Sequence, residues 1–167
     1  MTIRKKIFLL AGILLALFGA VVGVLAVIQK LDSDQISNIA KYELPLTRLV
    51  APPYSYLGAP LLLAGICLTA SAARAFSKAG TSVVPFERTT ALVTDGLYRY
   101  TRNPMYLGLV LIALGVWILL GTLSALIPFA IFIGIIEYRF VRREERFLES
   151  IFGRQYLGYK GRVRRWI

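Results

Sequence analysis

Long stretches without any charged residue alternate with short charged segments along this chain. Residues 7–28, 49–73 and 107–136 contain no Asp, Glu, Lys or Arg. An α-helix rises ~1.5 Å per residue, so about 20 residues cross a hydrocarbon core that is ~30 Å thick. The first two runs therefore predict two membrane-spanning helices, one over residues 7–28 and one over residues 49–73.

Charged residues on either side of the third run indicate how it folds. The run is too long for one upright span, and both segments that flank it, residues 74–106 and the tail from residue 137, contain more Lys and Arg than Asp and Glu. Segments with such a surplus tend to stay on the cytoplasmic side of a membrane. A single crossing would put them on opposite sides, so we expect a helical hairpin that turns near Gly121 and Thr122.

The fold class predicted from these features is all-α. We expect an integral membrane helical bundle with four transmembrane helices in a single domain, residues 1–167, and with both termini in the cytoplasm. The predicted segments, in chain order, are a first span over 7–28, a second over 49–73, a cytoplasmic loop over 74–103, a third span over 104–120, a fourth over 123–140 that extends to about 150, and a tail over 151–167.

The tail combines aromatic and basic residues with a helical spacing. Phe152, Tyr156, Tyr159, Val163 and Trp166 recur at intervals of three and four residues among several Arg and Lys residues. This pattern is typical of a helix that lies in the membrane surface with its apolar face in the lipid. The tail is therefore expected to form an amphipathic interfacial helix.

Composition supports a membrane protein and narrows its chemistry. Hydrophobic residues make up 57% of the 167 residues, the mean hydropathy is +0.65, and the formal net charge is +11. The positive charge follows the predicted topology, so the expected partner is a bilayer with an anionic cytoplasmic leaflet, and nucleic acid is not expected. No histidine is present and Cys67 is the single cysteine, so we expect neither a metal site nor an intramolecular disulfide.

Polar, cationic and aromatic residues gather directly before the third run. The segment 95–108 contains Arg102 and the pair Asn103-Pro104, which predicts a helix start with asparagine as N-cap and proline at the first helical position. The hairpin would bring this start close to Glu144 and Glu145, which follow its second arm. Arginine and helix N–H groups bind carboxylates, whereas glutamates bind ammonium or sulfonium groups, so a zwitterionic, cationic small molecule is the expected ligand.

Ordinary structural roles are alternatives for each of these clusters. Asn103 could serve only as a helix cap, and the neighbouring arginines and tyrosines could form the cationic and aromatic belt of a membrane surface. The two glutamates could lie on a solvated helix face, where Arg142 would pair with Glu145 and Arg146 with Glu149 at i,i+3 spacing.

Three stretches of the chain resemble one enzyme family. They are residues 92–108, which include Arg102-Asn103-Pro104-Met105-Tyr106, the pair Glu144-Glu145, and residues 152–159. Over roughly residues 86–167 the chain resembles the isoprenylcysteine carboxyl methyltransferase and phospholipid methyltransferase superfamily of integral membrane enzymes. The likeness of the first two spans is limited to their hydrophobicity.

The resemblance implies transfer of a methyl group from S-adenosylmethionine to a lipophilic acceptor, a carboxylate, an amine or a thiol, that enters from the bilayer. Arg102, Asn103 and Glu145 are the catalytic residues that it implies. The family often has histidine where this chain has Asn103, and asparagine forms hydrogen bonds but does not titrate. The implied cofactor-binding residues are Tyr98, Arg102, Asn103, Pro104, Tyr106, Gly108, Glu144 and Glu145.

Two other functions stay open at this point, and a bacterial or archaeal inner membrane is the expected location. A membrane reductase that resembles the steroid reductases could hold NADPH in a similar hairpin, although the paired glutamates would repel the phosphates of NADPH. A non-catalytic membrane assembly protein would use the same residues only to cap and anchor its helices.

The charge pattern predicts that residues 29–48 face away from the cytoplasm and that residues 74–106 face it. In a Cys67→Ser background, Asn38→Cys should react with an impermeant maleimide added outside intact cells. Ser77→Cys is the matched control and should react only after the cells are opened. Labelling of position 38 only from the inside would contradict the predicted topology.

Overall fold

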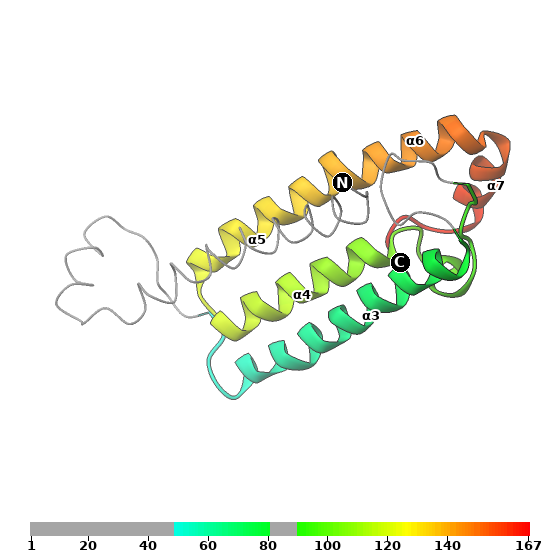
Figure 1. Ribbon diagram of the computed structural model, residues 1–167. Helices are drawn as coiled ribbons and strands as arrows, with labels where there is room; N and C mark the ends of the chain where they lie inside the picture. Colours follow the sequence, from blue (N-terminus) through cyan, green and yellow to red (C-terminus); the bar gives the residue numbers. More distant parts are fainter. Residues whose placement is uncertain (1–48, 81–89) are drawn as a thin grey trace, which may run out of the picture.

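The computed structural model describes residues 49–80 and 90–167, most of which lie in helices (Figure 1). The predicted first span, the loop after it and the middle of the predicted cytoplasmic loop lie outside the described residues. The helices, in chain order, are η1 (Tyr54–Leu57), α3 (Gly58–Lys78), η2 (Gly96–Arg99), α4 (Pro104–Leu120), α5 (Leu123–Ile135), η3 (Ile136–Val141), α6 (Arg142–Phe152) and α7 (Arg154–Arg162).

Helix α4 lies between α3 and a long rod that α5, η3 and α6 form together (Figure 1). α3 and α4 run antiparallel, and α5 then returns along α4. At one end of the bundle lie α6, α7, the start of α4 and the C-terminus (Figure 1). Segments that are far apart in the sequence therefore meet at this end.

The hairpin between α4 and α5 has its predicted position. Gly121 has a φ of +64° and ends α4, and its N–H donates to the carbonyl of Trp117 at 2.8 Å. Glycine adopts this left-handed conformation without the steric cost of a Cβ atom. As the sequence predicted, α4 covers Pro104–Leu120 and α5 begins at Leu123.

Helix α3 differs from the predicted second span at both ends. It begins at Gly58 and not at residue 49, because Pro52 and Pro53 lack the N–H groups of a helix and the short turn η1 follows them. It continues past residue 73 to Lys78. A charged side chain ends an apolar span but does not end a helix, so the predicted cytoplasmic loop begins only after Lys78.

The rod of α5, η3 and α6 changes from apolar to charged at Glu137. Its middle part, η3, is a π-helix, a form that occurs mostly as single turns and often at functional sites. Within the described residues, two helices are long and apolar enough to cross a membrane, Tyr54–Lys78 and Leu123–Phe152, and α4 is a shorter apolar helix. The topology of four spans stays a prediction.

The tail forms the helix α7, but its tyrosines pack on the protein where the sequence predicted contact with lipid. Gly153, with a φ of +48°, separates α6 from α7, and the side chains of Tyr156 and Tyr159 on α7 are buried against the rest of the protein. Trp166 packs against the apolar core. The aromatic spacing therefore marks a face that packs on protein, which a periodic pattern alone does not distinguish from a face that packs on lipid.

Closely packed glycines hold α3 against α4. Gly65 lies opposite Gly108, and Gly58 lies opposite Gly115. A Cβ atom on Gly65 would lie 2.6 Å from the carbonyl oxygen of Gly108 and 2.7 Å from the amide nitrogen of Ile112. These are backbone atoms, so they have little freedom to move aside. Small residues at a helix crossing let two backbones approach closely, as is common between helices in membranes.

We expect Gly65→Ala to lower the free energy of unfolding by ~1–3 kcal/mol, because the added methyl group collides with the backbone of α4. Gly134→Ala in α5 is the matched control, since among the described residues no atom outside its own helix backbone lies within 4 Å of its Cβ position, and alanine favours a helix. Denaturation in detergent micelles measures both effects. Equal stability of the two variants would contradict the close contact of α3 with α4.

Candidate functional site

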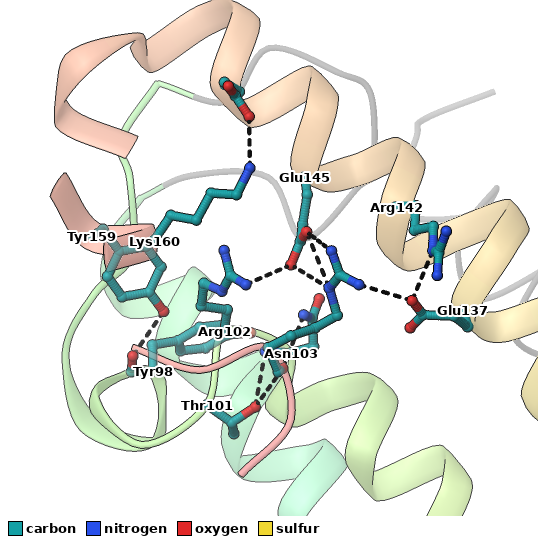
Figure 2. A network of polar contacts seen from close by, with 11 residues as sticks. Tyr98, Thr101, Arg102, Asn103, Glu137, Arg142, Glu145, Tyr159 and Lys160 are labelled. Atoms are coloured by element: carbon teal, nitrogen blue, oxygen red, sulfur yellow. Dashed lines mark hydrogen bonds and ion pairs between the residues drawn. The ribbon is translucent and has the colours of Figure 1, made fainter. Parts of the chain in front are cut away.

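Charged and aromatic side chains meet at the end of the bundle where α4 begins (Figure 2). They come from η2 and the residues after it, from the rod of η3 and α6, from α7, and from the segment after α7. The N–H of Arg102 donates to the carbonyl of Arg164 at 2.9 Å, and the hydroxyl of Tyr159 donates to the carbonyl of Tyr98 at 2.7 Å. Burial raises the pKa of Tyr159 above its usual range, so this hydroxyl keeps the proton that it donates.

Glu145 of α6 is the centre of the cluster, because its carboxylate contacts two arginines. Only 6% of its side chain is exposed. Arg165 donates from Nε to the two carboxylate oxygens at 3.1 and 3.2 Å and from Nη2 at 2.7 Å. Arg102 approaches the same carboxylate through Nη2 at 3.4 Å. The alternative of a solvated helix face is therefore wrong for Glu145, and Glu149 pairs with Lys160 of α7.

Glu137 of η3 extends this cluster toward the apolar part of the rod. Its Oε1 accepts hydrogen bonds from Nη1 of Arg165 at 2.9 Å and from Nε of Arg142 at 2.8 Å. Arg165 therefore bridges two carboxylates. Its hydrogen bonds with Glu145, and to a lesser extent the charge of Glu137, raise the pKa of Arg165.

Arg102 is buried and only partly paired. Its side chain is 9% exposed, and its Nε and Nη1 have no hydrogen-bond partner in the part of the chain that the structure describes. The buried Oε2 of Glu137 also lacks a partner there. Buried polar groups without partners are costly, so they point to a ligand that supplies the missing bonds. This cluster has unpaired donors for an anionic group and an unpaired acceptor for a donor group.

Asn103 is the N-cap residue of α4, but the prediction that its side chain caps the helix is wrong. Its Nδ2 donates instead to the carbonyl of Arg165 at 3.1 Å. The hydroxyl of Thr101 donates to the same carbonyl at 3.0 Å and accepts the N–H of Asn103 at 3.2 Å. The segment after α7 supplies an acceptor that local sequence does not reveal, so Asn103 fastens this segment to the start of α4.

Tyr106 and Glu144 form a separate link between α4 and α6. The hydroxyl of Tyr106 donates to Oε2 of Glu144 at 2.7 Å. The tyrosine ring is buried beside the ring of Phe140, with the centroids 6.3 Å apart. The structure thus brings these two predicted site residues into direct contact.

The other predicted site residues have clear packing roles. Tyr98 is buried, and its ring packs edge-on against Phe76 of α3 at a centroid distance of 5.3 Å. Pro104 is fully buried as the first residue of α4. Gly108 lies in the contact with Gly65, so α3 requires its small size whether or not a ligand binds.

Arg165 is the site residue that the sequence analysis missed. In the sequence it is one of several basic residues of the tail, and its partners Glu145 and Glu137 precede it by 20 and 28 positions. The spacing of the tail aromatics was the available signal that the tail packs on something. Nothing in that spacing distinguishes lipid from the protein.

We expect Asn103→Asp to lower the free energy of unfolding by ~1–3 kcal/mol at neutral pH, as for the loss of a buried hydrogen bond. Aspartate caps helices as well as asparagine does, but its carboxylate has no proton to donate to the carbonyl of Arg165. Asp95→Asn is the control, since it exchanges the same carboxylate and amide groups at an exposed position. The side chain of Asp95 forms a surface ion pair with Arg99, which contributes little to stability. Thermal unfolding in micelles measures the stability of both variants. An unchanged stability of Asn103→Asp would show that the hydrogen bond to the carbonyl of Arg165 does not contribute, and Asn103 would then act only as a helix cap.

The comparison with known proteins finds a methyltransferase family. A family model described as phospholipid methyltransferase matches residues 54–155. A protein-S-isoprenylcysteine O-methyltransferase of Schizosaccharomyces pombe is 38% identical over 72 residues, which are 43% of this chain and 30% of that protein. Protein-S-isoprenylcysteine O-methyltransferase B of Arabidopsis thaliana is 29% identical over 111 residues, which are 65% of this chain and 56% of that protein. The chain thus spans 30% and 56% of the length of these two relatives.

A solved structure shares the fold. It is that of the eukaryotic intramembrane Ras methyltransferase, isoprenylcysteine carboxyl methyltransferase, with a TM-score of 0.58 and 26% sequence identity over 66% of this chain and 40% of that one. The family model covers more than half of this chain and includes both Arg102 and Glu145. This chain therefore belongs to the phospholipid methyltransferase family.

Proposed function

We propose that this chain is an integral membrane methyltransferase that transfers a methyl group from S-adenosylmethionine to a lipophilic acceptor. The observation that carries this proposal is the buried, partly unpaired guanidinium of Arg102 beside the buried carboxylate of Glu145. The cluster lies at the charged end of an apolar bundle, and membership of the family gives the class of reaction.

Charge complementarity supports S-adenosylmethionine as the methyl donor. The molecule has a carboxylate, an ammonium and a sulfonium group. The unpaired Nε and Nη1 of Arg102 fit the carboxylate as charge-assisted donors. The carboxylates of Glu144 and Glu137 fit the cationic groups, and Oε2 of Glu137 has room for one more hydrogen bond.

The residues of the cluster have binding and orienting roles in this reaction. When bound, S-adenosylmethionine supplies a methyl group that its positive sulfur has already activated for displacement. The protein then mainly aligns the two reactants and excludes water. Arg102 and Glu145 orient the donor, Tyr106 is held in place by Glu144, and Asn103 keeps the segment after α7 over the start of α4. No step in this scheme requires a titrating residue at position 103.

The proposed acceptor is lipophilic because the cluster lies at the ends of helices that are apolar enough to cross a membrane. A carboxylate or thiolate acceptor attacks without the help of a base, whereas an ammonium group must first lose a proton. The relatives are named as O-methyltransferases, which favours an oxygen nucleophile in this chain.

The topology that we propose has four spans and both termini in the cytoplasm of a bacterial or archaeal cell. It puts the cluster at the cytoplasmic face, next to an anionic leaflet that the basic residues of α6 and the tail would contact. Soluble cofactor and membrane-bound acceptor can meet there.

We expect Glu144→Gln and Glu145→Gln each to weaken the binding of S-adenosylmethionine by ~1–3 kcal/mol, because each removes a charge that the ligand or Arg102 requires. Isothermal titration calorimetry on the purified protein in micelles measures the Kd. Glu149→Gln is the matched control, since Glu149 lies on the same helix, is partly exposed and pairs with Lys160.

Equal and small losses for all three variants would show that these carboxylates do not contribute to binding. The same titration with NADPH separates the methyltransferase from a reductase. Binding of NADPH, without binding of S-adenosylmethionine, would overturn the proposed function.

A further inference from the structure

Two guanidinium groups compete for the carboxylate of Glu145. Arg165 forms three hydrogen bonds with it, at 2.7, 3.1 and 3.2 Å. Arg102 has a single contact with it, at 3.4 Å, which is long for a charged hydrogen bond. Arg165 therefore has the better geometry of the two.

The better-paired arginine, Arg165, is the more exposed of the two, although the buried Arg102 has the greater need of a partner. The side chain of Arg165 is 33% exposed, so water can satisfy part of it, whereas that of Arg102 is 9% exposed. A buried cation loses more hydration and has the greater need of a close partner. The arrangement instead leaves Nε and Nη1 of Arg102 without a partner in the described part of the chain.

Backbone contacts explain why Arg165 lies beside the carboxylate of Glu145. Its carbonyl accepts hydrogen bonds from Thr101 and Asn103, and the carbonyl of Arg164 accepts one from the N–H of Arg102. On its other side, the guanidinium contacts Glu137 at 2.9 Å. The segment after α7 is thus fixed across the start of α4, and the side chain of Arg165 spans two carboxylates.

We propose that Arg165 is a positioning residue that keeps Nε and Nη1 of Arg102 available for the anionic group of the ligand. The identity of that group, the carboxylate of S-adenosylmethionine, rests on the proposed function. Arg165 does this by occupying both oxygens of Glu145, which Arg102 would otherwise bind through two of its nitrogens.

The loss of Arg165 has a specific consequence in this view. Glu137 retains Arg142 as a partner, at 2.8 Å, whereas among the described residues Glu145 retains only Arg102 as an ion-pair partner. The guanidinium of Arg102 then turns to form a two-bond pair with Glu145, as arginine and carboxylate groups commonly do. One of its two unpaired nitrogens is then used by Glu145 and the other is turned out of position, so the anionic group of the ligand loses its two-bond partner.

Two ligands that differ by one carboxylate test the proposal. In micelles, Arg165→Gln should weaken binding of S-adenosylmethionine about tenfold or more, the loss expected for one charged hydrogen bond. Binding of decarboxylated S-adenosylmethionine should change less than about twofold, because it lacks the group that Arg102 receives. Arg164→Gln is the matched control: it removes the same charge from the same segment and leaves the backbone contacts in place.

A measurement without ligand tests the same rearrangement. The Tm values of Arg102→Gln, Glu145→Gln and the double variant give the energetic coupling of the two residues. Expressed as a difference in Tm, this coupling should be larger by several degrees when Arg165 is replaced by Gln, because Arg102 and Glu145 then pair closely. If Arg165→Gln does not fold, Arg165→Lys replaces it, since a single ammonium group cannot hold both oxygens of Glu145 and also reach Glu137.

Other outcomes would overturn the proposal. Equal losses for the two ligands would make Arg165 a merely structural residue, and tighter binding in Arg165→Gln would make it a competitor of the ligand. If the unaltered protein binds neither ligand, the proposed function fails. The coupling between Arg102 and Glu145 still decides the role of Arg165 in that case, and an unchanged coupling refutes it.

Discussion

The charge of Glu145 is the constraint on which the arrangement of this end of the molecule depends. A carboxylate that is almost completely removed from water must be paired closely, because an isolated buried charge is very costly. Arg142, on the same helix, pairs with Glu137 instead. The partners come from the start of α4 and from the segment after α7, so the need to neutralise one side chain draws three distant parts of the chain together.

The apolar helices set the place where this happens. Glycines 58 and 65 of α3 and 108 and 115 of α4 let the two backbones approach, which fixes the start of α4 relative to α3. The chain reverses its direction at Gly121. The helices α5, η3 and α6 then run back along α4, so that α6 lies beside Arg102. Packing of small residues and one left-handed turn thus bring the start of α4 and α6 to the same end of the bundle, where Arg102 contacts Glu145.

Local signals accounted for part of this arrangement in advance. The bounds of α4 followed from Pro104 and Gly121, since a proline without N–H and a glycine at positive φ act within a single turn. The approach of the start of α4 to Glu144 and Glu145 followed from the hairpin, and Tyr106 contacts Glu144 there. The extent of α3 did not, because charged residues mark the end of an apolar surface and not the end of a helix.

The contacts of the tail could not be predicted from its sequence, for a physical reason. Its aromatic spacing is the same whether the apolar face packs on lipid or on protein, and the choice depends on whether the rest of the chain offers a surface. The side chain of Asn103 shows the same limit: local rules assign it to the helix N–H groups, but a carbonyl 62 positions away is the partner that it reaches.

Charge balance shows why the tail belongs to the site and is more than a cover. Glu137 and Glu145 have two formal negative charges, and Arg102 and Arg142 contact one of them each. Arg165 supplies the third positive charge and lies between the two carboxylates, so it reduces their mutual repulsion. A cluster paired in this way has no large net charge that would attract simple ions of either sign. It favours a ligand with both kinds of charge at a fixed separation, which can use the free nitrogens of Arg102 and the free oxygen of Glu137 together.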